Sequence, residues 1–264
     1  MDKRHWCVVT LIAVLGLMAG CAGKTTRGAV NDLAVANAMV DAAADVLETT
    51  IANDTDGTVR ALLGKAKGVL IIPAVDEASL LVSVGGGNAV LMALTDQGWT
   101  GPVFMTKGTV GVGFQAGVSR QSGILLFMHQ DDVRYMLRTG AIVQAHARLI
   151  VLNVAYEIHE TDAFYESGDV YFVGDRKGVY AGLAVNSGGF TDRTVLNEVY
   201  TGVPGGGPRA ILLERKLQPE GAQRLRDLLS QTGNGMKDSA EQQLFWQKKR
   251  TESKFRPELS LWGE

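Results

Sequence analysis

Val110-Gly111-Val112-Gly113-Phe114-Gln115-Ala116-Gly117-Val118 alternates bulky and bare positions with a period of two. Successive side chains of a β-strand point to opposite faces, so this stretch predicts a strand with one bulky face and one nearly bare face. A bare face that includes Gly111 and Gly113 permits close approach by a flat or slim object. Two occupants fit this pattern: an alanine-rich helix packed against the glycines, or a hydrophobic ligand such as an acyl chain.

The segments on both sides of this strand also have β character. Val69–Pro73 is a short apolar run that we expect to be a buried strand ended by its proline. Two hairpins are predicted, with the glycine-rich turn 85–88 between strands 79–84 and 89–94, and the charged turn 175–178 between strands 170–173 and 179–185. A further strand is predicted at 124–128. These connections are too short for helical crossovers, which favours antiparallel pairing.

Helical patterns flank the β segments. Residues 32–51 form an apolar stripe at helical spacing, and the opposite face is acidic; a helix that packs on the sheet is the favoured interpretation. The stripe contains Leu33, Ala36, Val40, Ala43, Leu47 and Ile51, and the acidic face contains Asp41, Asp45 and Glu48. Shorter helices are predicted at 58–67 with Asp56 or Thr58 as cap, at 131–138 ended by Gly140, and at 219–229.

The predicted fold class is therefore α+β. Its core is a largely antiparallel β-sheet, sandwich-like or barrel-like, with flanking N-terminal amphipathic helices and a helical C-terminal tail.

The first 21 residues have the pattern of a secretory signal. Lys3 and Arg4 precede the uncharged apolar run 7–18, and small residues lead to Cys21. This order is typical of a lipoprotein signal, so we expect residues 1–20 to be removed and Cys21 to be acylated as the lipid anchor. The run is shorter than the roughly 20 residues needed to span a bilayer; a retained spanning anchor is the alternative. Ala22 after the cysteine favours the periplasmic face of the outer membrane in a two-membrane bacterium.

Composition excludes some classes of function. The 264-residue chain has a formal net charge of −2, and nothing in this balance suggests nucleic acid. Its two cysteines, Cys7 and Cys21, leave no intrachain disulfide in an exported protein. The expected organisation is a signal peptide at 1–20, a tether at 21–31, one domain at 32–202 and a C-terminal extension at 203–264.

Four motifs in register resemble the SYLF domain family. They are the segment 66–73, the glycine-alternating strand 111–118, the run 125–128, and the segment 177–183 followed by 197–202. The motif residues singled out are Gly68, Pro73, Gly111, Gly113, Lys177, Gly178 and Gly182. The resemblance covers roughly residues 32–202.

The resemblance implies binding of lipid or phosphoinositide, actin binding in some eukaryotic members, and no enzymatic activity. Actin and phosphoinositides are not expected in a bacterial envelope, so anionic phospholipid or lipid A is the comparable target. The basic residues nearest the expected lipid contact are Arg60, Lys65 and Lys67. Each would contribute on the order of 1 kcal/mol near an anionic surface; the alternative is that they only solvate the exposed side of helix 58–67.

The C-terminal tail combines aromatic and basic residues, including Trp246, Lys248, Lys249 and Arg250. Residues 209–264 have a net charge of +3, whereas residues 21–208 have −6. Aromatics beside cations suit a membrane interface or an anionic polymer. A tail that packs back onto the acidic core explains the asymmetry as well.

A search for catalytic groups, metal ligands and cofactor motifs identifies no catalytic residue, no metal site and no cofactor. His129, His146 and His159 are not at helical metal-ligand spacing, and the glycine clusters lack the strand-turn-helix context of a phosphate loop. The leading hypothesis is a non-catalytic lipid-binding lipoprotein. The alternatives are an envelope scaffold that binds peptidoglycan or a protein partner, and an unrecognised hydrolase or metal enzyme. The oligomeric state is left open.

Overall fold

The computed structural model describes residues 29–55, 57–141, 149–153 and 170–234. Within these ranges the backbone alone is described for 29–30, 77–84, 110–119, 149–153, 175–188 and 233–234. The elements in chain order are α2 (Ala29–Ala52), α3 (Thr58–Leu63), β1 (Gly68–Thr95), β2 (Gly98–Phe127), α4 (Gln130–Thr139), β3 (Leu149–Asn153), β4 (Val170–Asp192), α6 (Thr194–Thr201), the π-helix η1 (Ala210–Glu214), the 3₁₀-helix η2 (Glu220–Ala222) and α7 (Gln223–Asn234).

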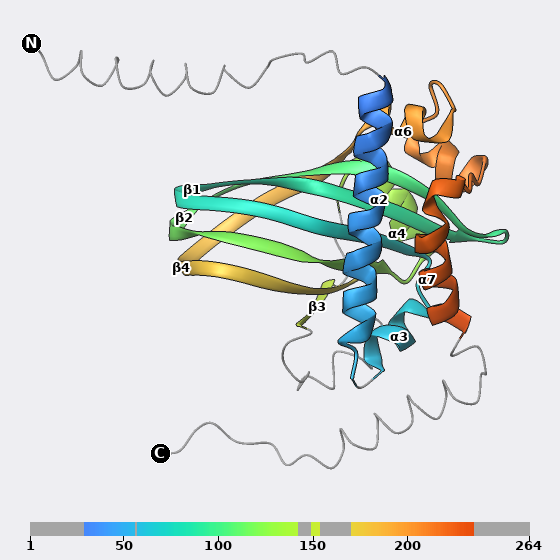
Figure 1. Cartoon of the computed structure of the whole chain (residues 1–264). Helices are drawn as coiled ribbons and strands as arrows, with labels where there is room; N and C mark the ends of the chain where they lie inside the picture. Colours follow the sequence, from blue (N-terminus) through green and yellow to red (C-terminus); the bar gives the residue numbers. More distant parts are fainter. Residues whose placement is uncertain (1–28, 56, 142–148, 154–169, 235–264) are drawn as a thin grey trace, which may run out of the picture.

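The described strands form one sheet in the order β1-β2-β4-β3. The β1–β2 and β2–β4 pairs are antiparallel, and the short β3 pairs in parallel with the start of β4. Helices lie before, between and after these strands (Figure 1). The predicted α+β class with a largely antiparallel sheet is therefore confirmed.

Strand β1 is long enough to turn back on itself. The Leu94 N–H donates to the Lys67 carbonyl at 2.9 Å. A Cβ on Gly87 would lie 2.8 Å from Val75 Cγ2 and against the Ala74 carbonyl. The two ends of β1 therefore lie side by side, and the chain reverses between Val75 and Gly87.

The predicted turn at 85–88 is wrong, because those residues pair in register with 106–109 of β2. Pro73 does not end its strand either. The β1–β2 register shifts between Ile72 and Val75, and this irregularity allows the strand to pass through a residue that has no N–H. Partners on the neighbouring strand outweigh the local turn preference of glycine.

The other two predicted strand breaks are also absent. Residues 110–118 and 124–128 belong to the single strand β2. Residues 175–178, expected as a turn, pair with 119–122 of β2 inside the continuous strand β4. The three neighbouring strands β1, β2 and β4, of 28, 30 and 23 residues, thus run side by side over most of their length.

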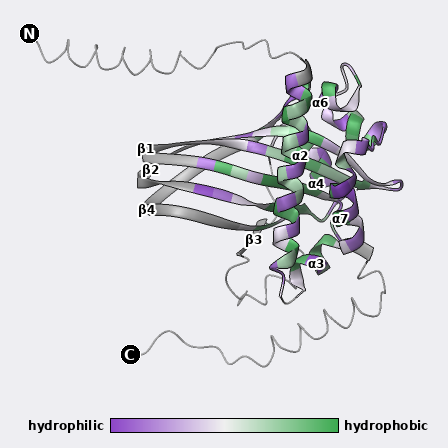
Figure 2. Cartoon of the chain, viewed as in Figure 1, coloured by the Kyte–Doolittle hydropathy of each residue, from purple (hydrophilic) through white to green (hydrophobic). Residues whose placement is uncertain are grey.

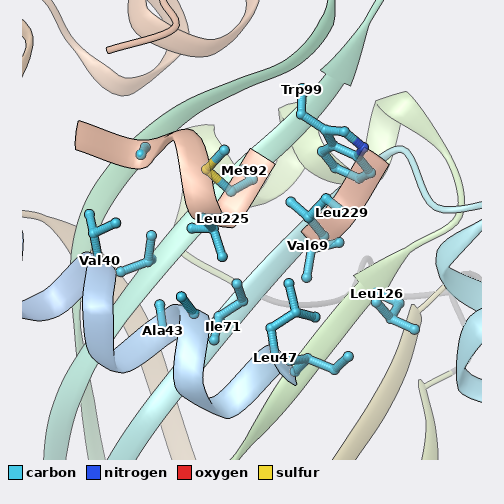
Figure 3. Close-up of a cluster of buried hydrophobic side chains, with 14 of the residues drawn as sticks. Val40, Ala43, Leu47, Val69, Ile71, Met92, Trp99, Leu126, Leu225 and Leu229 are labelled. Carbon is cyan, nitrogen blue, oxygen red and sulfur yellow. The ribbon is translucent and has the colours of Figure 1, made fainter. Parts of the chain in front are cut away.

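Both faces of the sheet are buried at the end where the helices gather. One face packs against α2, α3, α6 and α7, with Ile71, Met92 and Leu126 from the strands meeting Leu47 and Leu225 from the helices (Figure 3). The opposite face packs against α4 and η1 and includes Leu91, Phe127, Met136 and Leu212. Figure 2 shows hydrophobic residues along the strands beneath the helices and hydrophilic residues over much of α7.

Helix α2 confirms the predicted packing helix with one exception. Ala36, Val40, Ala43 and Leu47 are buried, and the acidic residues lie on the exposed side. Leu33, expected in the buried stripe, is 41% exposed because it lies in the first turns of α2. Alternation along β2 places Gly111 and Gly113 on the face of Leu125 and Phe127, away from α2. The alternative in which helix 32–51 packs against those glycines is therefore wrong.

The shorter helices differ from prediction mainly in their ends. Helix α4 ends at Gly140, which has φ 73° and donates its N–H to the Met136 carbonyl, as predicted. Helix α3 ends at Leu63, earlier than expected. Gly57, not Thr58, is the N-cap residue, and the carboxylate that accepts from the first turn belongs to Asp54. Asp56, the other expected cap, lies outside the described residues.

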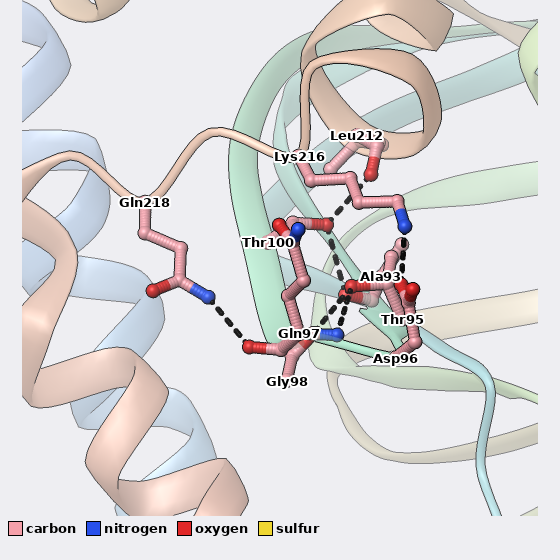
Figure 4. Close-up of polar contacts among 9 residues, drawn as sticks. All are labelled: Ala93, Thr95, Asp96, Gln97, Gly98, Thr100, Leu212, Lys216 and Gln218. Carbon is pink, nitrogen blue, oxygen red and sulfur yellow. Dashed lines mark hydrogen bonds and ion pairs between the residues drawn. The ribbon is translucent and has the colours of Figure 1, made fainter.

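A strap formed by residues 212–218 fastens the β1–β2 turn (Figure 4). The buried Thr100 hydroxyl lies 2.8 Å from the Leu212 carbonyl and 3.1 Å from the Ala93 carbonyl. The Gln218 amide donates to the Gln97 carbonyl at 3.0 Å, and Lys216 forms an ion pair with Asp96. This pair lowers the pKa of the Asp96 carboxyl. Described residues after Gly202, from η1 to α7, thus pack on the sheet as part of the same body.

Candidate functional site

Arg60, the first predicted headgroup ligand, is used by the fold itself. Asp54 is almost fully buried, and its carboxylate accepts hydrogen bonds from the Val59 and Arg60 N–H groups at 3.0 and 2.9 Å. The Arg60 guanidinium completes this arrangement at 3.3 Å from the carboxylate and 2.8 Å from the Asp54 carbonyl. A buried carboxylate needs such partners, so Arg60 neutralises Asp54 and stabilises the start of α3.

Lys65 and Lys67 lie together in the short connection between α3 and β1, and both are exposed. The backbone of Lys67 is held on both sides: its N–H donates to the Phe127 carbonyl at 2.7 Å, and its carbonyl accepts from Leu94. Ala66 between the two lysines is fully buried. The result is a pair of cations on a fixed backbone, which loses less conformational freedom on binding than a mobile loop does.

Gly68, the residue after Lys67, has little space for a side chain. A Cβ at this position would lie 2.6 Å from Val133 Cγ2 of α4. Glycine is therefore required where the start of β1 passes under α4. Gly68 and Pro73 are structural positions, and they fix where Lys67 lies.

The remaining motif residues form a different cluster. Lys177 lies in register with Arg120 of β2, which in turn lies in register with Asp76 of β1. The Arg120 Nε and Asp76 Oδ1 are 3.7 Å apart, and both side chains are 68% exposed. Gly178 pairs with Ser119, and Gly182 pairs with Gln115. Sequence reasoning missed Arg120, because only the strand register shows that it neighbours Lys177.

The two cationic groups are separate. Arg120 is paired with Asp76, eight residues along β1 from Gly68. At ~3.3 Å per residue this separation is about 26 Å along the strand. A single small headgroup cannot contact both Lys67 and Arg120, whereas an extended surface can.

Asn197 is a structural residue that sequence reasoning identified only as part of a motif. It is fully buried, its Oδ1 accepts from the Phe104 N–H at 2.7 Å, and its Nδ2 donates to the Phe104 carbonyl at 3.2 Å. The side-chain amide thus replaces a strand partner just where the β2–β4 ladder ends, at Met105 and Asp192. Tyr200, one turn further along α6, packs edge-on against the Phe104 ring with centroids 5.1 Å apart.

The acidic face of α2 is partly neutralised by α7. Arg224 contacts Asp45 at 2.9 Å and Glu48 at 2.5 Å, and its bonds to Glu48 and then Asp45 raise the pKa of the guanidinium. This observation agrees with the prediction that the outward face of α2 is acidic.

Several predicted residues lie outside the described residues: Cys21, Trp246, Lys248, Lys249 and Arg250, together with His146 and His159. Among the residues that the structure describes, no group of three potential metal ligands comes together. The same part of the chain contains no helix that is both long and apolar enough to cross a bilayer.

The exposed cations lie on fixed backbone positions, and the buried polar groups named above serve the fold. Residues 108–232 match the family described as Ysc84, Las17-binding protein actin regulator. The resemblance to the Ysc84, or SYLF, domain family is therefore confirmed over those residues. This is a family of binding and regulatory domains related to actin and lipid.

Relatives of known name are distant. The chain is 22% identical over 169 residues to the SH3 domain-containing YSC84-like protein 1 of Xenopus laevis, covering 64% of this chain and 50% of that protein. It is 21% identical over 155 residues to the human protein of the same name, covering 58% and 45%. The chain thus spans about half the length of the curated relatives that it matches. No solved structure matches it.

Proposed function

We propose that this protein is a non-catalytic, lipid-anchored envelope protein whose SYLF domain binds anionic membrane lipid. The observation that carries the proposal is the pair of exposed cations, Lys65 and Lys67, on the fixed α3–β1 connection. The family match supports a binding role.

Arg60 is not part of the proposed contact surface, because it is committed to the buried Asp54 carboxylate. Lys65 and Lys67 follow α3 and precede the strand, where a planar anionic surface can approach both. Each exposed cation near such a surface contributes on the order of 1 kcal/mol. That amount is weak alone and becomes useful when an acyl chain already holds the protein at the membrane.

Cys21 is the proposed anchor, and the periplasmic face of the outer membrane is the proposed location. Cys21 lies eight positions before Ala29, the first residue of α2. At ~3.5 Å per residue an extended tether reaches about 28 Å, so an acylated Cys21 would keep the domain close to the bilayer. Metabolic labelling with an acyl-chain precursor tests this step: wild type should be labelled and the Cys21→Ser variant should not.

Liposome co-sedimentation of residues 21–264 with Cys21→Ser tests the headgroup contact. Binding should increase with the anionic lipid fraction, decrease with salt, and fall when Lys65 and Lys67 are both changed to Ala. The matched control changes Arg134 and Arg138, two exposed cations of α4, to Ala, which removes the same charge. Equal losses from both double variants would show only a net-charge effect.

Deletion of residues 239–264 separates the lipid proposal from the scaffold alternative. If this deletion alone abolishes binding, the contact moves to the tail that contains Trp246 and Lys248. If the domain binds purified peptidoglycan and no lipid, the scaffold function replaces the proposed one.

A further inference from the structure

The end of the sheet remote from the helices has an unusual composition. Figure 1 shows β1, β2 and β4 running on together beyond α2 and α7. Residues 78–87 of β1, 108–119 of β2 and 178–188 of β4 contain no charged residue. We refer to these three paired segments as the tongue.

Charged residues surround the base of the tongue. Asp76, Arg120 and Lys177 form one row across the three strands. Glu77 and Arg176 lie beside that row, and Lys107 marks the base on the returning part of β2. The change from a charged base to an uncharged tongue is therefore sharp on every strand.

The strand register shows the composition of each face of the tongue. Val82, Val112 and Val185 lie in one row across the three strands. Alternation along β2 puts Val110, Val112, Phe114, Ala116 and Val118 on the α2 side of the sheet, and glycine, glutamine and serine on the other. Because neither face carries a charge, the face that is outermost is uncharged whichever way the sheet curves.

The tongue has the length of one lipid leaflet. Gly87 lies against Val75, so the chain runs outward and then returns within the ten residues 78–87. Five residues per limb at ~3.3 Å each give about 16 Å. Half of a bilayer hydrocarbon core of ~30 Å is about 15 Å.

We propose that the tongue inserts into the outer layer of a lipid bilayer, with the row Asp76–Arg120–Lys177 at the headgroup level. This inference rests on the proposed binding of anionic lipid and assigns its headgroup contact to Arg120 and Lys177, because Lys65 and Lys67 lie about 26 Å along β1 from that row. Vesicle binding that is unchanged when Lys65 and Lys67 are both changed to Ala supports insertion of the tongue, and binding lost in that variant returns the contact to the α3–β1 connection. The two cations of this row, Arg120 and Lys177, meet lipid phosphates, while the valine-rich segments enter the acyl region. Among the described strands, residues 175–189 of β4 pair only with β2. The other edge of β4 therefore has backbone N–H and carbonyl groups that need water as a hydrogen-bond partner. Insertion is accordingly limited to one lipid layer, because unpaired backbone groups are costly in hydrocarbon.

A single-cysteine probe tests the inference. The sequence has only Cys7 and Cys21, so residues 21–264 with Cys21→Ser and Val82→Cys carry one thiol, which is labelled with the polarity-sensitive dye NBD. The matched control places the thiol at Gln97, an exposed residue of the β1–β2 turn at the opposite end of the same strand. Vesicles contain phosphatidylethanolamine and phosphatidylglycerol.

The expected result is a severalfold rise in NBD emission at position 82 on vesicle binding, quenched by lipid spin-labelled high in the acyl chain, with no change at position 97. Val112→Asp should weaken vesicle binding about tenfold while the circular dichroism spectrum stays unchanged. If that variant does not fold, the labelled pair decides alone.

Three outcomes would overturn the inference. Vesicle binding that persists while position 82 stays silent leaves headgroup binding in place and removes insertion. An emission rise that depends on protein concentration without vesicles assigns the tongue to a second copy of the chain. Absence of vesicle binding under all lipid compositions removes both the insertion and the proposed function.

Discussion

The covered and uncovered ends of the sheet show how differently parts of one strand, β1, can be used. Leu91 and its neighbours at one end are fully buried between helices on both faces of the sheet. Ten residues earlier, Leu81 lies in the tongue, which continues beyond α2 and α7 (Figure 1). Helices cover the buried side chains at one end of the sheet, whereas the other end has an uncharged composition that the buried core does not require. This difference is the reason for the proposal that the uncovered end meets a lipid surface.

The largest expected effect comes from the same substitution at these two positions. Leu91→Ala should lower the free energy of unfolding by about 3 kcal/mol, because it removes a fully buried side chain from a packed core. Leu81→Ala should cost less than about 1 kcal/mol, because α2 and α7, among the helices that the structure describes, do not reach that part of the strand. Urea unfolding of both variants measures the difference. Equal losses would show that the tongue is packed as tightly as the helix-covered end.

A smaller effect is expected at Asn197, which closes the covered end of the β2–β4 ladder. Asn197→Leu should lower the free energy of unfolding by about 2 kcal/mol, since the Phe104 N–H loses its partner in a buried site, while the Phe104 carbonyl keeps the Arg193 N–H. Asn31→Leu, at an exposed position of α2, is the control for the change of residue type. An Asn197→Leu protein as stable as the control would show that the amide is not needed to end the ladder.

The smallest effect concerns the pH dependence of the covered end. The pKa of Tyr200 is raised to about 12 from its ordinary value of 10; burial is the largest cause, while Arg226 acts to lower the pKa and Asp41 acts to raise it. Because the folded protein holds this proton more tightly than the unfolded chain, the stabilisation is complete below pH 10. It is lost as the pH rises from about 10 through about 12.

Tyr200→Phe removes this titration. Between pH 9 and pH 11 the wild type should lose more stability than the variant, as measured by the urea concentration at half-unfolding. Parallel losses in the two proteins would show that Tyr200 ionises as easily in the folded state as in the unfolded chain.

Local patterns predicted the elements well where one segment decides its own structure. The stripe of α2, the glycine that ends α4 and the alternation of 110–118 are all confirmed, because helix and strand periods act over a few residues. The turns at 85–88 and 175–178 were wrong, because the hydrogen bonds of neighbouring strands hold these residues extended. Glycine permits a turn there and does not impose one.

The candidate site divides in the same way. Lys65 and Lys67 could be chosen from the sequence because they precede a recognisable strand, and their exposure is confirmed. The role of Arg60 could not, since its partner Asp54 is recognised only when the carboxylate is seen to be buried. Arg120 and Lys177 are 57 positions apart in the chain, and only strand register makes them neighbours.

The sequence alone determined the α+β class, the family resemblance, the helix faces and the uncharged character of the segments that form the tongue, because composition and short-range periodicity are properties of the chain. The tertiary structure decided which strands pair, that β1 returns to its own start, and that Asn197 ends the β2–β4 ladder. These features depend on contacts between residues far apart in the chain, whose free energy no local pattern contains.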